Sequence, residues 1–434
     1  MEQLALFWHR RDLRISDNAG LYKALKSGLK VQAIFIFDSQ ILAHLSKNDQ
    51  RVLFIHQTIQ NLQQAYQKLG ASLWIFHGNP TEIIPQLVQK HEIKHVFCNR
   101  DYEPNALKRD KSVYDALTKI GCQFSGSKDH VIFEKEEIVK SDGNPYHVFT
   151  PYMKRWKEQL NDFYLQPYPV EKYIHNLNPN NHVELPTLSE LGFSEIQTQH
   201  FPSAEIPQTI IQSYENTRDF PAINGTTRLS IHLRFGTISI RELAKQALKT
   251  NEKYFNELIW RDFYQMILFF YPRTIEETFR KEYGRIEWEF DEKLFQAWCD
   301  GKTGYPLVDA GMRELNETGH MHNRVRMVVA SFFCKHLFHD WKLGERYFAE
   351  KLLDFELASN VGGWQWAAGC GVDAAPYFRI FNPTTQQERF DPQFEYIKKW
   401  VPEFGTSDYP QPIVEHKWAR ERTLENYKKV LKAE

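Results

Sequence analysis

Four side chains that could do chemistry recur at three- and four-residue spacing within one stretch of the chain. They are Glu257, Trp260, Arg261 and Tyr264, and a helix with this spacing places all of them on one face. Together they could hydrogen-bond to a flat heterocycle and stack on it. The simpler alternative is a half-buried aromatic face on which Glu257 and Arg261 form a solvated ion pair.

Tryptophan is concentrated in the second half of the sequence, where eight of the 11 indoles lie between Trp260 and Trp418. The densest group is the run Trp364-Gln365-Trp366. Indole is easily oxidised, stacks on flat rings and carries one N–H donor. We interpret the cluster as suited to a flavin, a nucleobase or both, although one tryptophan alone is more typical of a core.

Two further segments combine polar and basic groups. The first, from Gly225 to Ser230, brings three hydroxyls and a guanidinium within six residues. At a loop-to-helix junction, where free backbone N–H groups and the helix dipole attract phosphate, it would form a pyrophosphate cradle; a plain helix cap is the alternative. The second segment places Asn323 and Met327 one helical turn apart with two arginines between them, although Met327 by itself is most typical of a core.

These side chains need elements that position them. The first 135 residues alternate short apolar runs with amphipathic ones, which is typical of βαβ units. The predicted strands are 4–8, 31–37, 73–76, 95–99 and 122–124, and the predicted helices include 50–69 and 105–120. We therefore expect a Rossmann-like α/β domain with a doubly wound parallel sheet. No G-x-G-x-x-G motif follows the first strand, so an ordinary dinucleotide site is not expected there.

The rest of the chain divides into a connecting region and a helical domain. Six prolines punctuate a polar stretch from 165 to 207, which we interpret as a long linker that wraps over one domain. From residue 210 the pattern is helical, with a capping box that starts at Ser239, Pro306 in a first turn, and Gly301 and Gly319 at helix ends. The expected domains are 1–135, a connecting region 136–207 and an all-α domain 208–434.

Composition limits the class of protein. The length of 434 residues favours two or more domains, and a formal net charge of -1 means that a nucleic-acid surface would need its basic residues on one face. The five cysteines contain no C-x-x-C pair, which argues against a metal site and against a disulfide framework. No stretch approaches the roughly 18 apolar residues of a membrane span, and we expect a cytoplasmic protein without membrane contact.

Five strings in order along the chain resemble the photolyase/cryptochrome family, in particular its class I cyclobutane pyrimidine dimer photolyases. They are NELIWRDFY from Asn256, GKTGYP from Gly301, HNRVRM from His322, GGWQW from Gly362 and RIFNPTTQ from Arg379. The resemblance covers nearly the whole chain. It implies an N-terminal α/β domain, a helical domain that holds FAD, and light-driven repair of ultraviolet-damaged DNA by a monomer.

The resemblance assigns side chains around the flavin: phosphate contacts, an ion pair beside the isoalloxazine, an amide facing N5, and further cofactor contacts. The phosphate contacts match Tyr214, Thr226, Thr227, Arg228, Leu229 and Ser230. The ion pair matches Arg326 and Asp354, and the amide matches Asn360. The further cofactor contacts match Phe355 and Glu356. An asparagine at N5 favours the fully reduced, repair-competent flavin. Three indoles match the chain that carries an electron from the surface to the photoexcited oxidised flavin, namely Trp364, Trp341 and Trp288.

The resemblance also assigns a pocket for a flipped-out pyrimidine dimer. Its residues are Glu257, Trp260, Arg261, Tyr264, Asn323, Arg324, Met327, Trp366 and Gln386. The expected catalytic residues are Glu257, Asn323 and Asn360, and a protonated Glu257 would donate a hydrogen bond to the carbonyl on which charge develops. Relatives that repair the pyrimidine-pyrimidone photoproduct have histidines where Asn323 and Met327 stand, so the cyclobutane dimer is the expected substrate.

Two questions stay open. Folate-binding relatives carry a glutamate where this chain has Ala106, which argues against a folate antenna. A deazaflavin, a second flavin, a ribityllumazine or an empty antenna site remain as alternatives. The competing function is a cryptochrome-type blue-light receptor that signals through a protein partner, and the short stretch after Asn382-Pro383 favours the enzyme.

Overall fold

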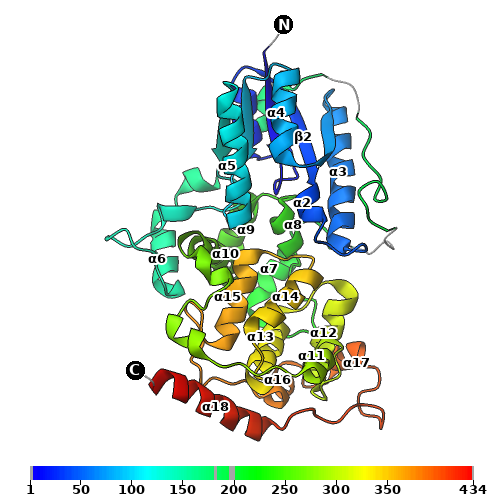
Figure 1. The fold of residues 1–434 in the computed structure, drawn as a ribbon, viewed down its shortest axis with the longest axis vertical. Coiled ribbons are helices and arrows are strands. Elements are labelled where there is room, and N and C mark those ends of the chain that lie inside the picture. The colour runs from blue at the N-terminus through cyan, green and yellow to red at the C-terminus, as the bar shows by residue number, and fades with distance from the viewer. Residues whose placement is uncertain (1–2, 180–182, 195–200, 433–434) are drawn as a thin grey trace. The chain divides into compact units, whose positions relative to one another are not determined.

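The computed structural model describes residues 3–179, 183–194 and 201–432. The chain forms two compact units that are interleaved along the sequence. The first, here called the sheet unit, contains residues 1–134, 159–206 and 228–249. The second, the helical unit, contains residues 135–158, 207–227 and 250–434. Figure 1 labels the helices and strands of both units.

A five-stranded parallel sheet forms the centre of the sheet unit. Its strands are β1 (Leu4–His9), β2 (Lys30–Asp38), β3 (Leu73–Gly78), β4 (His95–Asn99) and β5 (Gln123–Ser127), in the order β3-β2-β1-β4-β5. This order confirms the predicted doubly wound α/β fold. The central strands are buried on both faces, which is why their sequences are continuous apolar runs instead of alternating ones. Only the weak fifth strand begins later than predicted, at Gln123.

Helices cover both faces of this sheet (Figure 1). On one face α1 (Ala19–Lys26) and α3 (Gln50–Lys68) pack around Phe7, Leu21 and Ile59, which are fully buried. On the other face α4 (Pro80–Lys90) and α5 (Pro104–Lys119) pack around Leu6 and Ile84. The short α2 (Ser39–Leu42) follows β2. Neighbouring residues of β1 thus belong to opposite cores, as the pleat of a strand requires.

The connecting region is divided between the units: residues 159–206 belong to the sheet unit, and residues 135–158 belong to the helical unit. Two short turns, η2 (Asp162–Leu165) and η3 (Val170–Asn176), precede an isolated parallel bridge between Leu177 and Val31. Val170, Leu177, Leu191 and Phe193 are buried in the same core as α1 and α3. Residues 180–182 and 195–200 of the predicted linker lie outside the described residues.

Two helices from the second half of the sequence also belong to the sheet unit. They are α8 (Ser230–Phe235) and α9 (Ile240–Thr250). Ser239 Oγ accepts from the backbone N–H groups of Arg241 and Glu242 at 3.1 and 3.4 Å, so it caps α9 as predicted. The Arg241 guanidinium is buried between Asp17 and Asp129, at 2.9 and 2.8 Å, which anchors α9 in this unit.

The helical unit is all-α, as predicted. Its helices are α6 (Phe149–Gln159), α7 (Gln208–Thr217), α10 (Glu252–Phe270), α11 (Glu292–Cys299), α12 (Pro306–Thr318), α13 (Asn323–Ser331), α14 (Trp341–Lys351), α15 (Leu357–Ala368), α16 (Pro383–Phe390), α17 (Glu395–Trp400) and α18 (His416–Lys432). Shorter turns are η1 (Lys135–Glu137), η4 (Pro272–Ile275), η5 (Lys281–Arg285) and the π-helical η6 (Phe332–His336). The predicted signals hold at α12, which starts at Pro306 and ends at Gly319 with φ 66°.

Within the described ranges, no helix is at once long enough and apolar enough to cross a bilayer. The five cysteines are buried free thiols. Burial raises the pKa of the Cys370 thiol to about 12, so this group is unreactive at neutral pH.

Candidate active site

The α10 helix carries four of the predicted site residues on one side. Asn251 caps the helix by accepting from the backbone N–H of Tyr254 at 3.0 Å. The Tyr264 ring lies directly on the backbone of α15, since a Cβ placed on Gly362 would come within 2.3 Å of it. Glycine is therefore required at this crossing. The close approach brings the tryptophan-rich string of α15 next to the α10 side chains.

Trp260 is already stacked on one face. Its ring lies on Phe149 from α6, with ring centroids 3.7 Å apart and an angle of 7° between the planes. Tyr264 lies 5.6 Å away and is tilted by 31°. A planar ligand that stacks on Trp260 must therefore use the face opposite Phe149.

Glu257 and Arg261 form ion pairs with residues outside α10. Glu257 makes a short contact with Arg218, which follows α7. Arg261 Nη2 lies 2.9 Å from Glu356 Oε1, and the two side chains are only 10% and 7% exposed. A ligand that bonds to the Glu257 oxygen held by Arg218 must displace this arginine.

The N-terminal turn of α13 presents Asn323 and Met327. His322 precedes the helix, and its Nδ1 accepts from the backbone N–H of Arg324 at 3.2 Å. Burial lowers the pKa of His322 to about 4, so the ring is neutral at pH 7. Asn323 is exposed and Met327 is half-buried, which leaves both side chains within reach of a ligand.

Arg218 and Asp219, which are adjacent at the end of α7, hold two of the predicted lesion-binding side chains. Arg218 contacts Glu257, and Asp219 Oδ1 accepts from Arg324 Nη2 at 2.7 Å. The Arg324 guanidinium also lies 4.3 Å from the ring centroid of Phe390, and its buried Nε has no hydrogen-bond partner among the described residues. A ligand of this pocket must exchange these ion pairs for its own hydrogen bonds, and Arg324 Nε offers it a donor.

Trp366 and Gln386 lie on α15 and α16. Trp366 is half-buried, and its ring centroid lies 6.5 Å from that of Phe381. Gln386 Oε1 and Asn256 Oδ1 are buried acceptors that have no hydrogen-bond partner in the part of the chain that the structure describes. An unpaired buried acceptor is costly in a folded protein, and its persistence is typical of a site that binds a polar ligand.

Asn360 on α15 is fixed by α14. Its Nδ2 donates to the backbone oxygen of Glu345 at 3.0 Å and to Glu345 Oε1 at 2.8 Å. Burial raises the pKa of the Glu345 carboxyl. Because the amide nitrogen is engaged by Glu345, the carbonyl oxygen is the atom that Asn360 can offer to a ligand.

The predicted ion pair between Arg326 and Asp354 is present. Arg326 Nη2 lies 3.0 Å from one Asp354 oxygen and 3.1 Å from the other, and Arg326 Nε donates to the Met321 backbone oxygen at 2.7 Å. Next in the chain, Phe355 packs against the core of the helical unit. The Asp354 side chain is 9% exposed, and a charge buried to this extent is stabilised by a paired guanidinium.

The predicted phosphate segment lies at a loop-to-helix junction, because α8 begins at Ser230. Arg228 has φ 53°, a left-handed conformation that side chains rarely adopt. Arg228 and Ser230 are exposed, Thr226 is half-buried, and Leu229 is buried, so Leu229 can offer only backbone groups. The two compact units divide within this segment, after Thr227.

In the helical unit, Tyr214 and Thr227 both contact Tyr254. The rings of Tyr214 and Tyr254 are 5.0 Å apart in an edge-on arrangement, and Thr227 Oγ1 lies 3.0 Å from the Tyr254 hydroxyl. Burial raises the pKa of Tyr254 to about 12, so its hydroxyl keeps its proton. The Arg218 guanidinium lies over the Tyr214 ring at 5.2 Å.

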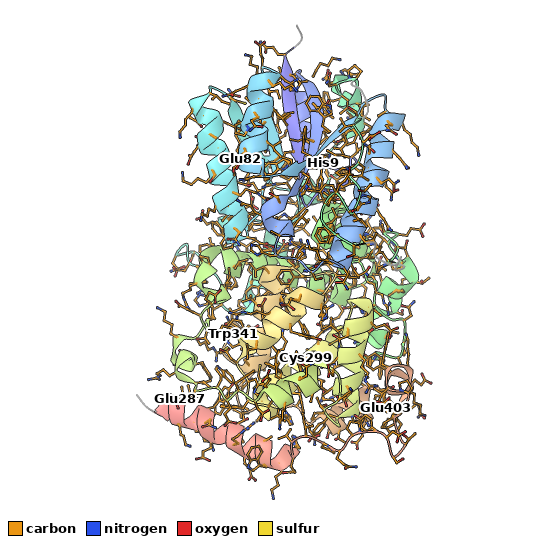
Figure 2. The ribbon with its side chains drawn as sticks, turned by 45° about the vertical axis from the view of Figure 1, so that its right-hand side comes forward. His9, Glu82, Glu287, Cys299, Trp341 and Glu403 are labelled. Atoms are coloured by element: carbon orange, nitrogen blue, oxygen red, sulfur yellow. The ribbon has the colours of Figure 1, made fainter. Side chains whose placement is uncertain are left out.

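The three predicted electron-transfer indoles share the core of the helical unit. Trp364 and Trp341 are 2% and 1% exposed, and Trp288 packs against the same core with part of its surface open. The backbone of α14 touches Trp364, because a Cβ on Gly344 would come within 2.1 Å of its ring. Figure 2 labels Trp341 at the start of this helix.

Ala106, the residue that argues against folate, lies in the first turn of α5 in the sheet unit. It is buried, and its side chain has no polar group to offer. A cavity of about 690 Å³ lies alongside α3 in the same unit, with Phe54, Asn61 and Lys68 among its lining residues. This volume is within the range of pockets that hold small ligands.

Several contacts of the site could not be read from the sequence. Four side chains contact predicted site residues without lying on the same helix as those residues. They are Glu345, Arg218, Asp219 and Phe149. Spacing connects residues only within one helix, so it cannot identify such partners. A local signal existed only for Arg218, which lies four positions after Tyr214.

Two family models match the chain. The model described as DNA photolyase matches residues 5–172, and the model described as the FAD binding domain of DNA photolyase matches residues 254–407. The deoxyribodipyrimidine photo-lyase of Halobacterium salinarum is 37% identical over 480 residues, which cover 97% of this chain and 98% of the relative.

Solved structures of similar proteins cover the whole chain. A bacterial class III photolyase from Agrobacterium tumefaciens superposes with a TM-score of 0.88 at 31% identity, covering 100% of this chain and 98% of the other. An archaeal photolyase from Sulfolobus tokodaii, solved with two FAD molecules, superposes with a TM-score of 0.84 at 32% identity, covering 98% of this chain and 100% of the other.

Proposed function

The chain belongs to the photolyase/cryptochrome family, and we propose that it is a light-driven DNA-repair enzyme whose substrate is the cyclobutane pyrimidine dimer. One observation carries the proposal. The side chains expected to bind a pyrimidine dimer are grouped on α10, α13 and α15 within the FAD-binding domain. Curated relatives that align over nearly their full length bear the name deoxyribodipyrimidine photo-lyase.

FAD is the cofactor of this domain. When bound, reduced FAD supplies one electron on blue-light excitation and recovers it after the cyclobutane ring has opened. We assign the Arg326–Asp354 pair and the Asn360 oxygen to the isoalloxazine, and Tyr214 with the 226–230 segment to the phosphates. The orientation that Glu345 imposes on Asn360 supports this assignment, because it leaves an acceptor for a flavin N–H.

The lesion would be held by stacking and by hydrogen bonds that compensate unpaired groups. Trp260 and Trp366 offer faces for the pyrimidine rings. Gln386 Oε1 can accept from an imide N–H, and Arg324 Nε can donate to a carbonyl; both atoms are buried and unpaired. Glu257 and Asn323 would bond the remaining polar edges of the dimer.

The site favours the cyclobutane dimer over the pyrimidine-pyrimidone photoproduct. Repair of the latter needs an acid that protonates the lesion, and Asn323 and Met327 stand where such an acid is expected. His322, the neighbouring histidine, cannot take this role at pH 7 because burial lowers its pKa to about 4. A cyclobutane dimer needs only the electron.

A second chromophore is consistent with the fold, and its identity stays open. The related archaeal structure is described with two FAD molecules, one implied to be a novel light-harvesting cofactor. Ala106 argues against folate in this chain. We further propose that the enzyme acts on DNA as a cytoplasmic monomer.

The test uses the purified protein loaded with FAD and chemically reduced. Under blue light it should restore the ultraviolet absorbance of oligothymidine that contains cyclobutane dimers, while the dark sample should not. Binding to the damaged oligonucleotide should weaken steeply with salt, because lysines and arginines neutralise phosphates. An FAD-loaded, photoreducible protein that leaves the dimers intact would contradict the proposal and favour a blue-light receptor.

A further inference from the structure

We propose that Trp364 is re-reduced by a second route, which runs through Trp298 to Tyr347 at the surface, in addition to the route expected through Trp341 and Trp288. Neither Trp298 nor Tyr347 belongs to the chain of indoles predicted from the sequence. The inference rests on the proposed function, because it concerns the photoreduction of the same flavin.

Three aromatic rings form an unbroken series. The centroids of Trp298 and Trp364 are 6.1 Å apart with an angle of 73° between the planes. Those of Trp298 and Tyr347 are 5.4 Å apart at 62°. Both pairs have the edge-to-face geometry of rings in contact. Electron transfer weakens steeply as the gap between donor and acceptor grows, so a series of touching rings is a favourable path.

Trp298 is suited to pass positive charge onward. It is 0% exposed, and its indole Nε1 has no hydrogen-bond partner within residues 3–179, 183–194 and 201–432. An oxidised indole is trapped as a neutral radical when it can give its N–H proton to an acceptor. Trp298 has no such acceptor, so the charge remains free to move to the neighbouring ring.

Tyr347 is suited to be the end of the route. It is half-buried, its hydroxyl donates to Asn316 Oδ1 at 2.6 Å, and the Cys299 backbone oxygen lies 3.2 Å away. Its open side lets the hydroxyl proton leave to water once the ring is oxidised. The Lys351 ammonium lies 5.5 Å from the ring centroid, which disfavours a lasting positive charge there and favours the neutral form.

Each route includes one residue of α14, while Trp298 lies on α11. Trp341 and Tyr347 are six positions apart on α14, so they project from different sides of it. Gly344, between them, lets the α14 backbone touch the Trp364 ring. Figure 2 labels Cys299, the residue after Trp298, and Trp341 in the helical unit.

Three electron transfers connect Tyr347 to the flavin. One electron passes from Trp364 to the photoexcited oxidised flavin, one from Trp298 to Trp364, and one from Tyr347 to Trp298. Tyr347 releases its hydroxyl proton to water and becomes a neutral radical. A thiol reductant in solution then returns one electron and one proton to Tyr347.

The experiment compares FAD-loaded variants under blue light with a thiol present. Trp341→Phe should retain a slower photoreduction and a transient tyrosyl absorption. Adding Trp298→Phe or Tyr347→Phe to that variant should abolish both signals. Trp364→Phe should abolish photoreduction outright, whereas Trp400→Phe, which removes another indole with an unpaired N–H, should match the wild type. FAD content and near-ultraviolet circular dichroism verify folding.

The proposal is overturned if Trp341→Phe has no residual photoreduction, or if its residual photoreduction survives both added substitutions. Should the Trp298→Phe protein fail to fold, the Trp341→Phe/Tyr347→Phe protein decides the question, because Tyr347 lies at the half-exposed end. Repair by chemically reduced wild-type protein is measured separately. If this protein does not repair dimers, the proposed function is wrong. The tyrosyl absorption still tests the second route in that case.

Discussion

Glu345 fixes Asn360 through two hydrogen bonds to the same amide nitrogen, at 2.8 Å from the carboxylate and 3.0 Å from the backbone oxygen. One residue of α14 thereby sets both the place and the orientation of an amide on α15. The amide oxygen is left to face away from Glu345. If Asn360 faces the flavin N5, Glu345 is the residue that decides which atom the flavin meets.

Glu345→Gln tests this relationship. A glutamine side chain can donate as well as accept, so only the backbone oxygen of residue 345 still favours one orientation of the Asn360 amide. We expect FAD to remain bound but the photoreduced flavin to reoxidise several-fold faster in air, measured by the recovery of absorbance in the dark. Glu350→Gln, at an exposed position of the same helix, is the matched control. Equal reoxidation in all three proteins would show that Glu345 does not position Asn360.

Asp354→Asn should weaken FAD retention and lower the free energy of unfolding. The substitution removes the charge that Arg326 meets at 3.0 Å, and a hydrogen bond to a charged group contributes about 2 kcal/mol. Urea unfolding and release of FAD on dilution measure the two effects. The control is Glu277→Gln, which loosens an exposed pair with Arg273 and should cost less than about 0.5 kcal/mol. A loss no larger than the control's would exclude a structural role for the pair.

Glu257→Gln should lower the number of dimers split per absorbed photon by about tenfold, the effect of losing roughly one charge-assisted hydrogen bond. The affinity for damaged DNA should fall by less, because stacking on the tryptophans is unchanged. Glutamine can still accept from Arg218, so the fold is preserved. Glu252→Gln, near the start of the same helix and 79% exposed, is the control. An unchanged quantum yield would remove Glu257 from the mechanism.

The parts of the fold that the sequence predicted are those whose pattern is local. Strands buried on both faces appear as apolar runs, and α3, a long amphipathic helix, was predicted to within one residue of its end at Lys68. Which core a helix packs against is not local information. The helices α8 and α9 have the same periodicity as their neighbours in sequence, yet they belong to the sheet unit.

The candidate site likewise contains features that a local pattern predicts and contacts that it does not. Spacing placed Glu257 and Arg261 on one face and suggested that they pair, but the ion pairs found lead to Arg218 and Glu356. Tertiary partners prevail because a contact that is partly buried has less competition from water than an exposed pair along a helix. The family resemblance supplied the positions that we propose for the site. It did not identify the charges that hold those positions, such as Glu345.

Lys335 gives the protein a specific dependence of stability on pH. It is buried in η6 and donates to the backbone oxygens of Tyr377 and Arg379 at 3.1 and 3.2 Å. Burial lowers the pKa of its ammonium from 10.5 to about 8. Below pH 8 the group is protonated in both the folded and the unfolded chain. Between pH 8 and 10.5 the unfolded chain holds a proton that the folded chain has released, so this contribution to stability rises with pH.

Comparison with Lys335→Met isolates that contribution, since methionine does not titrate. The free energy of unfolding of the wild type minus that of Lys335→Met should rise by about 3 kcal/mol from pH 7 to pH 10.5. The buried thiols of Cys334 and Cys370 act in the opposite direction above pH 9, but they are present in both proteins. Lys398→Met, at an exposed position, should show no such rise. A wild-type minus Lys335→Met difference that stays constant with pH would mean that Lys335 keeps its ordinary pKa in the folded protein.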